Sequence, residues 1–110
     1  MITRVHSATI PVTDQDRALD FYVNVLGWEK VTEWPMGPGM RFITVRPAEG
    51  SAEISLGSLD WLPEGWGTIG GHTGIGLEAE DVEETYRVLS ERGVRFKGPV
   101  EEAPWGGKMV

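Results

Sequence analysis

The first complete pattern of apolar and polar positions lies between residues 7 and 28. Within residues 7–12 apolar and polar side chains alternate, with Ala8, Ile10 and Val12 on one side, which is typical of a strand with one buried face. Apolar residues then recur at three- and four-residue steps, which predicts a helix. Thr13 or Asp14 can cap this helix, and Gly27 can end it. The stretch therefore predicts a β-α unit.

Three more strands are expected in the first half of the chain, at residues 28–34, 40–46 and 52–56. Residues 1–5 extend the first strand, and residues 35–39 form a turn. Pro11 has no N–H group, so the first strand should lie at a sheet edge or carry a local irregularity there. The first half is therefore predicted as β-α-β-β-β, with its last three strands in an antiparallel meander.

The opening pattern returns in the second half of the chain. Residues 72–79 alternate like a strand, Asp81 can cap a helix that Gly93 ends, and a further strand begins near Lys108. Asp81 follows Asp14 at an offset of 67 residues, and a fixed offset of this kind indicates an internal duplication. The second copy is short by about one strand and a half. Either the chain is truncated or a partner chain completes the sheet.

These patterns predict one domain over residues 1–110, built from module one (1–57), a connector (58–71) and module two (72–110). The net charge of −7 argues against nucleic acid and anionic membranes as partners. The chain has no cysteine, so disulfides and thiolate metal sites are excluded. With no signal peptide or long apolar stretch, we expect a cytoplasmic protein.

Three segments carry a family resemblance: DQDRALDFYVNVLGW at 14–28, PMGPGMRF at 35–42 and DVEETYRVLSERGV at 81–94. The chain resembles the glyoxalase, bleomycin-resistance and extradiol-dioxygenase superfamily, the vicinal oxygen chelate fold. The resemblance implies an α+β fold in which two βαβββ modules form a cupped mixed sheet with helices on the outer face. It also implies a homodimer, and in many members one divalent metal in the cup.

The resemblance places the metal ligands at Ser7, Ser55, Gly74 and a position beyond Val110. A serine hydroxyl is a poor ligand and glycine has no side chain, so we expect neither a metal centre nor another cofactor. The alternative keeps a divalent metal in a shifted site, for which Glu53, His72 and Glu78 are the candidates because strands preserve facing at every second residue. Glu53 and His72 are then also the candidate catalytic residues.

Each of these residues also has a simpler interpretation. Glu53 and Glu78 can be solvated carboxylates, and His72 can be a rim residue beside the glycine turn. His6 is expected to point away from the cup, toward the helices or an interface. Arg41 is expected to pair with a surface acid in preference to binding an anionic ligand.

Small side chains on the cup face leave room for a ligand, and tryptophan, phenylalanine and methionine side chains could line or cover that space. The expected pocket residues are Ser7, Thr9, Trp34, Met40, Phe42, Ser55, Trp61, Trp66, Gly74 and Gly76. The alternative is that the large apolar residues complete a core or a dimer contact.

Three functions are compatible with these observations. The first is a small-molecule-binding protein of the glyoxalase and bleomycin-resistance type that lacks the usual metal centre. The second is a divalent-metal-dependent lyase or dioxygenase, in which the metal acts as a Lewis acid. The third is a non-catalytic assembly module. Whether the protein is an enzyme stays open at this point, because one fold hosts many activities.

Overall fold

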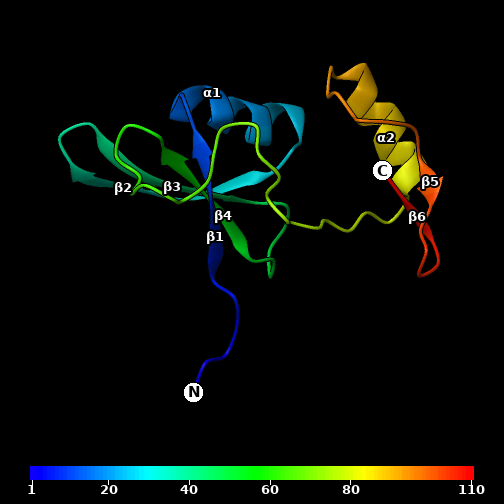
Figure 1. Cartoon of the computed structure of the whole chain (residues 1–110), viewed down its shortest axis with the longest axis horizontal. Coiled ribbons are helices and arrows are strands. Elements are labelled where there is room, and N and C mark those ends of the chain that lie inside the picture. The colour runs from blue at the N-terminus through cyan, green and yellow to red at the C-terminus, as the bar shows by residue number, and fades with distance from the viewer. The chain divides into compact units, whose positions relative to one another are not determined.

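The computed structural model describes residues 1–110, which divide into two compact units, Met1–Gly74 and Ile75–Val110. Figure 1 shows the elements of both units. The first unit contains β1 (Ser7–Val12), α1 (Gln15–Asp20), a π-helical turn η1 (Phe21–Val25), β2 (Glu29–Gly37), β3 (Met40–Arg46) and β4 (Glu53–Ser58). The second unit contains α2 (Val82–Glu91), β5 (Glu101–Glu102) and β6 (Lys108–Met109).

The first unit is a mixed four-stranded sheet in the order β1-β4-β3-β2. β1 runs parallel to β4, while the pairs β2–β3 and β3–β4 are antiparallel. This arrangement confirms an α+β fold with one βαβββ module and its predicted meander. β1 lies at the edge, as the proline at position 11 predicts, because a central strand would require its missing N–H group.

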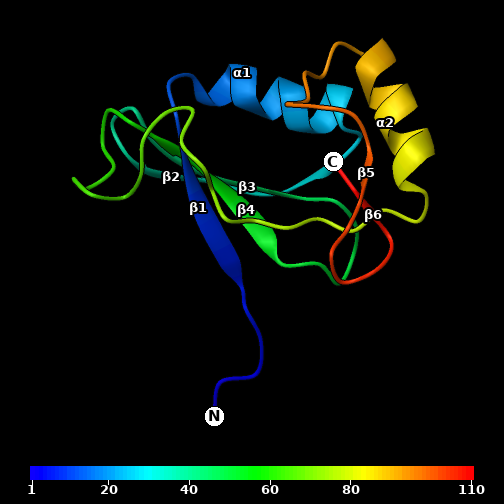
Figure 2. The same cartoon turned by 45° about the vertical axis from the view of Figure 1, so that its right-hand side comes forward.

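One face of this sheet is covered by α1 and η1, which lie along the same side of the sheet in Figures 1 and 2. The core between them consists of Ile43, Val45, Ile54 and Leu56, of which all but Ile54 are 0% exposed. Helix residues from the predicted apolar stripe pack against this core, among them Ala18, Leu19 and Tyr22. The buried core stabilises the sheet on this side, and the same strands carry the side chains of the opposite face.

Polar contacts at the start of α1 fix the helix to the sheet. Of the two predicted cap residues, Asp14 is the one that accepts a hydrogen bond from the Arg17 backbone N–H, at 3.0 Å. The buried amide of Gln15 donates to the carbonyl oxygens of Arg41 and Leu56, both at 2.8 Å. Gln15 thus satisfies two carbonyl groups where the β3–β4 ladder ends.

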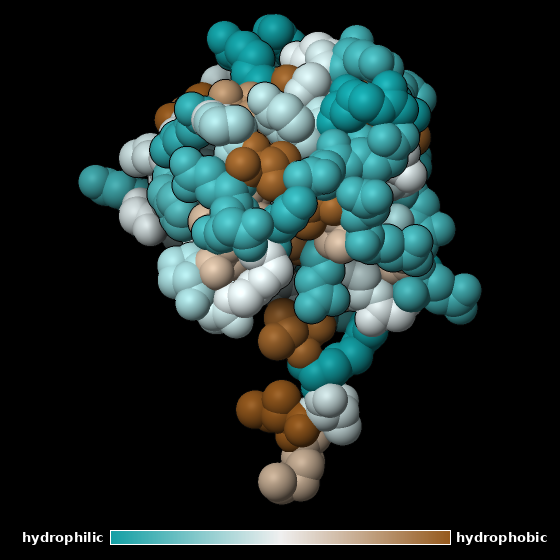
Figure 3. Space-filling view, turned by 90° about the vertical axis from the view of Figure 1, so that its right-hand side faces the viewer, coloured by the Kyte–Doolittle hydropathy of each residue, from teal (hydrophilic) through white to brown (hydrophobic).

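Three predicted strand boundaries in the first unit were wrong by two or more residues, and one of them is the end of β4, which lies at Ser58 and not at residue 56. Residues 1–5 do not extend β1 and are exposed; Figure 3 shows apolar atoms on this projecting segment. They lack a neighbouring strand, since the ladder with β4 begins at the Ser7–Glu53 pair. β2 continues through the predicted turn to Gly37, because an irregularity between Pro35 and Gly37 keeps the pairing with β3.

The second unit departs further from the prediction. Residues 72–79 form no strand, although their apolar and polar positions alternate. The second-module helix and its Asp81 cap are confirmed, as is a strand near Lys108. β6 pairs with the unpredicted β5 in a two-stranded hairpin, which Figures 1 and 2 show beside α2. No helix of the structure is long and apolar enough to cross a membrane.

Candidate functional site

The sheet face opposite α1, here named the open face, carries the side chains of Ser7, Thr9 and Pro11 and of the residues paired with them. In the β1–β4 register these three residues lie beside Glu53, Ser55 and Gly57. Because paired residues point to the same side of a sheet, the β3 and β2 residues aligned with them also lie on this face. The register arranges the open face in three parallel rows, which differ in chemistry.

The middle row consists of hydroxyl side chains. Thr9 pairs with Ser55, Ser55 pairs with Thr44, and Thr44 pairs with Thr32, so one hydroxyl is contributed by each strand. Thr44 is 0% exposed and Ser55 is 3% exposed. The two central residues of the hydroxyl row are therefore buried, whereas Thr9 and Thr32 at its ends are half-buried and can donate to or accept from a bound molecule.

A charged row lies next to the hydroxyl row. Glu29 pairs with Arg46 across β2 and β3 and forms an ion pair with it. Continuing the Thr44–Ser55 register by two residues brings Arg46 opposite Glu53. Arg46 has a raised pKa, chiefly because Glu29 accepts its hydrogen bond, with a smaller contribution from the charge of Glu53. The charged row thus alternates acid, base and acid.

Glu53 is the buried carboxylate of this row. It is 5% exposed, and its Oε1 accepts a hydrogen bond of 2.7 Å from the Thr44 hydroxyl. Its Oε2 lies 3.7 Å from His6 Nε2, which is too far for a hydrogen bond. The interpretation of Glu53 as a solvated carboxylate was therefore wrong, because β4 is an inner strand with neighbours on both sides.

The structure also corrects the prediction for His6. Its ring lies near the Glu53 carboxylate, on the side of the open face, and not toward the helices. The alternation that predicted the opposite direction does not apply, because β1 begins only at Ser7. The His6 side chain is 61% exposed, so it reaches the carboxylate from the solvent side.

The third row is apolar. Trp34 pairs with Phe42 across β2 and β3, and Gly57 pairs with Pro11 across β4 and β1. Trp34 is 65% exposed, which is unusual for so large an apolar side chain. Met40 follows on the same side of β3 as Phe42, by strand alternation. Three of the expected pocket residues thus gather at this end of the open face.

Residues 58–71 cover part of the apolar row. Leu62 lies so close to Gly57 that a Cβ atom there would meet its side chain at 2.8 Å, and a Cβ atom at Gly67 would contact Pro11 at 3.4 Å. In the same segment Trp61 has a buried indole N–H without a hydrogen-bond partner, whereas Trp66 is exposed. The connector tryptophans therefore belong to a segment that packs on the open face.

The remaining predicted site residues lie outside these rows. His72 is exposed, and its Nδ1 accepts a hydrogen bond of 3.0 Å from the backbone N–H of Gly74. Gly76 and Glu78 are exposed residues of the second unit. No group of three or more histidine, aspartate or glutamate side chains could hold a metal ion in this structure.

Arg41 lies on the sheet face that α1 covers. Its guanidinium group is 2.9 Å from both Asp16 and Glu33, and these hydrogen bonds raise its pKa, with Asp16 as the larger cause. The predicted pairing with surface acids is confirmed. Arg41 of β3 therefore links α1 and β2 through these two ion pairs.

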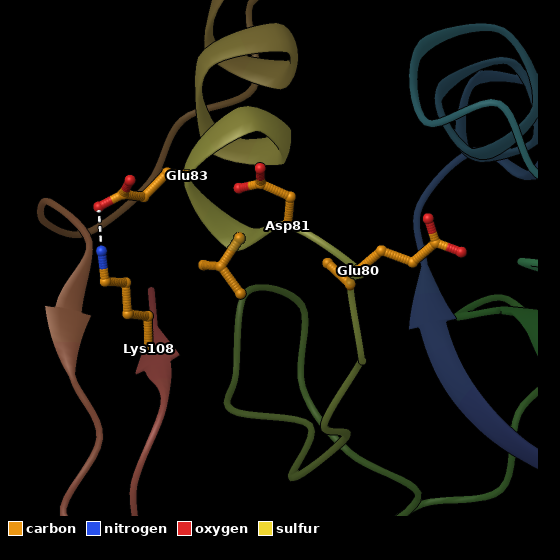
Figure 4. Close-up of a pocket in the computed structure, with 6 residues that line it drawn as sticks. Glu80, Asp81, Glu83 and Lys108 are labelled. Carbon is orange, nitrogen blue, oxygen red and sulfur yellow. Dashed lines mark hydrogen bonds and ion pairs between the residues drawn. The ribbon is translucent and has the colours of Figure 1, made fainter.

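The second unit has a pocket at the start of α2, lined by Ala79, Glu80, Asp81, Val82, Glu83 and Lys108. Figure 4 shows Lys108 directed toward Glu83, with 2.6 Å between the ion-paired atoms, and Glu80 directed away from them. Asp81 caps α2 by accepting from the Glu84 backbone N–H. Asp81 in this pocket therefore caps α2, and the Glu83–Lys108 ion pair joins α2 to β6.

Sequence reasoning missed Thr44, Arg46 and Gln15. Thr44 and Arg46 alternate with the apolar Ile43 and Val45, so the period of β3 could have placed them on the open face with Phe42. Gln15 is different, because its carbonyl partners are 26 and 41 residues away along the chain. No local pattern identifies such a long-range contact.

Comparisons with known proteins agree with this architecture. Residues 4–110 match the family model of the Glyoxalase/Bleomycin resistance protein/Dioxygenase superfamily. The chain belongs to this superfamily. A crystal structure of a superfamily member from Sphaerobacter thermophilus DSM 20745 is 50% identical, with a TM-score of 0.89 over 97% of this chain and 85% of that chain.

Two further relatives belong in the same comparison. TnmS3, an antibiotic binding protein from Streptomyces sp. CB03234, is 33% identical, with a TM-score of 0.71 over 96% of this chain and 82% of its own. The uncharacterized protein YetH of Bacillus subtilis (strain 168) is 26% identical over 106 residues, which are 96% of this chain and 86% of YetH. The superfamily therefore includes a relative that binds an antibiotic.

The donor set on the open face does not fit a divalent metal. Ser7 and Ser55 offer neutral hydroxyl groups, which are poor ligands for such an ion. Glu53 is the carboxylate nearest to them in the register, and its Oε1 already accepts from Thr44. Divalent ions in proteins typically take three or four nitrogen or oxygen ligands, more than this face supplies.

Proposed function

We propose that the protein binds a small, largely aromatic molecule on the open face, without a divalent metal. The observation that carries this proposal is the register of the open face, which sets a row of hydroxyl side chains beside an apolar row with an exposed tryptophan. Neutral hydroxyl groups next to Trp34 and Phe42 suit a ligand with aromatic rings and a few polar substituents. The likeness to an antibiotic binding protein supports the same class of function.

The expected pocket residues take two roles in this proposal. Trp34, Met40 and Phe42 provide apolar contact, and the half-buried Ser7 and Thr9 provide hydrogen bonds, while the small buried Ser55 lies beside Thr9 and leaves room above it. Trp61 and Trp66 belong to the segment that packs beside the apolar row, and in this proposal they cover the ligand at that end.

We also propose a homodimer in which the modules of two copies complete the cupped sheet. The edge of β1 has hydrogen-bonding groups to offer, and residues 72–79 keep a strand-like alternation without forming a strand. Leu77 in this segment is 62% exposed, and a dimer contact would bury it. Sedimentation at increasing protein concentration measures this assembly, and a monomer at all concentrations contradicts it.

Ligand titration tests the binding function. We expect doxorubicin, an antibiotic with fused aromatic rings, to quench the tryptophan fluorescence in a saturable manner. Trp34→Leu should weaken binding by about tenfold, because it removes a large aromatic contact. Trp105→Leu is the matched control, since Trp105 is exposed in the second unit and is not a candidate site residue.

Metal analysis completes this test. Protein purified without chelators should contain no stoichiometric Zn, Ni, Mn or Fe, and a chelator should leave the binding curve unchanged. A stoichiometric transition metal, or ligand binding that depends on one, would overturn the proposal. A fluorescence signal that no aromatic compound changes would argue for the assembly module instead.

A further inference from the structure

The three rows of the open face form a gradient of polarity along the strands. Residues of one face are spaced at roughly 7 Å along a strand, so the charged and apolar rows lie roughly 13 Å apart, with the hydroxyl row between them. Glu53 stands at one end of this gradient, and Trp34 and Phe42 stand at the other. A molecule that contacts both ends must be elongated and have two chemically different ends.

The charged row carries an excess of negative charge. The row has one guanidinium group, that of Arg46, and this group forms an ion pair with Glu29. The side chains nearest to the Glu53 carboxylate are the Thr44 hydroxyl, which donates to Oε1, and the His6 ring, 3.7 Å from Oε2. Arg46 also lies opposite Glu53, so the row holds two carboxylates and one guanidinium group, and a bound cation beside Glu53 would balance the second carboxylate.

The geometry of Glu53 leaves one oxygen for such a cation. Its Oε1 is occupied by the Thr44 hydroxyl, whereas its Oε2 makes no close hydrogen bond and faces the exposed His6 ring across 3.7 Å. A ligand nitrogen that entered beside His6 could donate to Oε2 without disturbing Thr44. Hydrogen bonds to charged groups contribute about 1.5–3 kcal/mol.

We infer that the ligand of the open face is an elongated aromatic amine, whose ammonium group binds Glu53 Oε2 and whose rings lie on Trp34 and Phe42. This inference rests on the proposed function and specifies its ligand class. Thr9 and Thr32, the half-buried ends of the hydroxyl row, then lie beside the middle of the ligand and suit a polar linker there. Charge complementarity sets the direction in which the molecule lies along the strands.

The test uses two probes that differ in one charge. Dansylcadaverine carries a naphthalene ring and a terminal ammonium group on an aliphatic linker, and its N-acetyl derivative has the same rings and linker without the charge. Energy transfer from tryptophan to the dansyl group reports binding of both probes to the full chain. We expect the amine to bind roughly tenfold more tightly than the acetylated probe.

Two glutamate variants locate the source of this preference. Glu53→Gln keeps an acceptor for the Thr44 hydroxyl and should abolish the preference for the amine, while the acetylated probe binds as before. Glu33→Gln removes the same charge from the face that α1 covers, and the preference should persist. A shorter amine, dansyl-ethylenediamine, should show little preference, because its ammonium group cannot reach Glu53 when the rings lie on Trp34 and Phe42.

The outcomes separate this inference from the proposed function. If both dansylcadaverine and its acetylated derivative bind the parent protein equally, the aromatic site stands and the inference about the amine is wrong. If Glu33→Gln removes the preference as fully as Glu53→Gln, the effect comes from net charge and the inference is also wrong. If neither probe binds and doxorubicin gives no signal, the proposed function fails together with the inference. Circular dichroism of each variant confirms that its fold is retained.

Discussion

The two units of the molecule start from the same local pattern and end in different structures. Asp14 and Asp81 cap their helices with nearly the same backbone angles, −139° and 109° against −137° and 101°, and each accepts a backbone hydrogen bond at 3.0 Å. The helix regions end near Gly27 and Gly93, both with positive φ. Yet a strand precedes the first helix and none precedes the second.

The difference lies in long-range pairing. β1 forms because β4 supplies a parallel partner for all six of its residues, and the sheet face beneath α1 then closes over a core. Residues 72–79 have a similar alternation but no ladder, and the one apolar side chain buried in the second unit is Ala103. Alternation of apolar and polar residues is therefore compatible with a strand but not sufficient for one, because a strand also needs a neighbouring strand to pair with.

The largest expected effect comes from separating the units. A fragment of residues 1–74 should keep a β-rich circular dichroism spectrum and unfold cooperatively, because its core lies within this range. A fragment of residues 75–110 should be unfolded, because chains below about 40 residues seldom fold without a staple and an isolated helix as short as α2 is marginal in water. A folded 75–110 fragment would contradict the comparison.

The next effect compares one leucine from each unit. Leu56 is 0% exposed in the core, so Leu56→Ala should lower the free energy of unfolding by about 2–5 kcal/mol. Leu77 is exposed, so Leu77→Ala should change it by no more than about 0.5 kcal/mol in the monomer. Urea unfolding at several protein concentrations measures both, and a Leu77→Ala cost that grows with concentration would locate Leu77 in the dimer contact.

Much of the first unit could be predicted from its sequence because its local signals agree with its long-range contacts. The alternation of residues 7–12, the Asp14 cap and the β3 range of 40–46 all reappear in the structure. The end of β2 could not be predicted, because the irregularity that lets it pass Pro35 depends on pairing with β3. The π-helical turn η1 was not predicted either, although the sequence contains a sign of it. Gly27 follows Asp14 by thirteen positions, whereas Gly93 follows Asp81 by twelve. One extra residue within a helix is what a π turn accommodates.

Sequence periodicity predicted which residues share the open face better than it predicted how far each of them is buried. Ser7, Thr9, Ser55, Trp34 and Phe42 share the open face, as strand periodicity predicts. The burial of Glu53 could not be predicted, since it follows from the inner position of β4 and from Thr44, nine residues away. The direction of the His6 ring could not be predicted, because it depends on the residue at which β1 begins. Strand boundaries are the part of a secondary-structure prediction that the sequence determines least well.

A smaller effect is expected from the two helix caps. Asp14→Ala and Asp81→Ala each remove one capping acceptor, which typically costs about 1 kcal/mol. The first variant should lower the cooperative unfolding midpoint, because α1 packs on the core of the first unit. The second should lower only the helical signal of α2. Asp14→Asn and Asp81→Asn keep a capping oxygen and serve as controls, and equal shifts of the midpoint in both alanine variants would show that the units unfold as one.

The smallest expected effect is the response to acid, which again differs between the units. Hydrogen bonds from Arg41, and secondarily from Lys30, hold the pKa of Glu33 below its ordinary value of 4.5, and a hydrogen bond from Arg87 lowers the pKa of Glu84 in the same direction. Both carboxylates bind protons more readily when unfolded, so their stabilisation is complete above about pH 4.5 and is lost as the pH falls through the lower folded-state pKa.

The consequences of that loss should differ, because Glu33 pairs with a guanidinium group that joins β2, β3 and α1, whereas Glu84 pairs within α2. Thermal unfolding between about pH 6 and about pH 3 should therefore show a steeper loss of the first unit's midpoint in the parent protein than in Glu33→Gln. Glu84→Gln should change only the acid dependence of the α2 helical signal. Since both pairs are solvent-exposed, added salt should reduce the two effects, and an acid response that salt leaves unchanged would show that these pairs do not cause it.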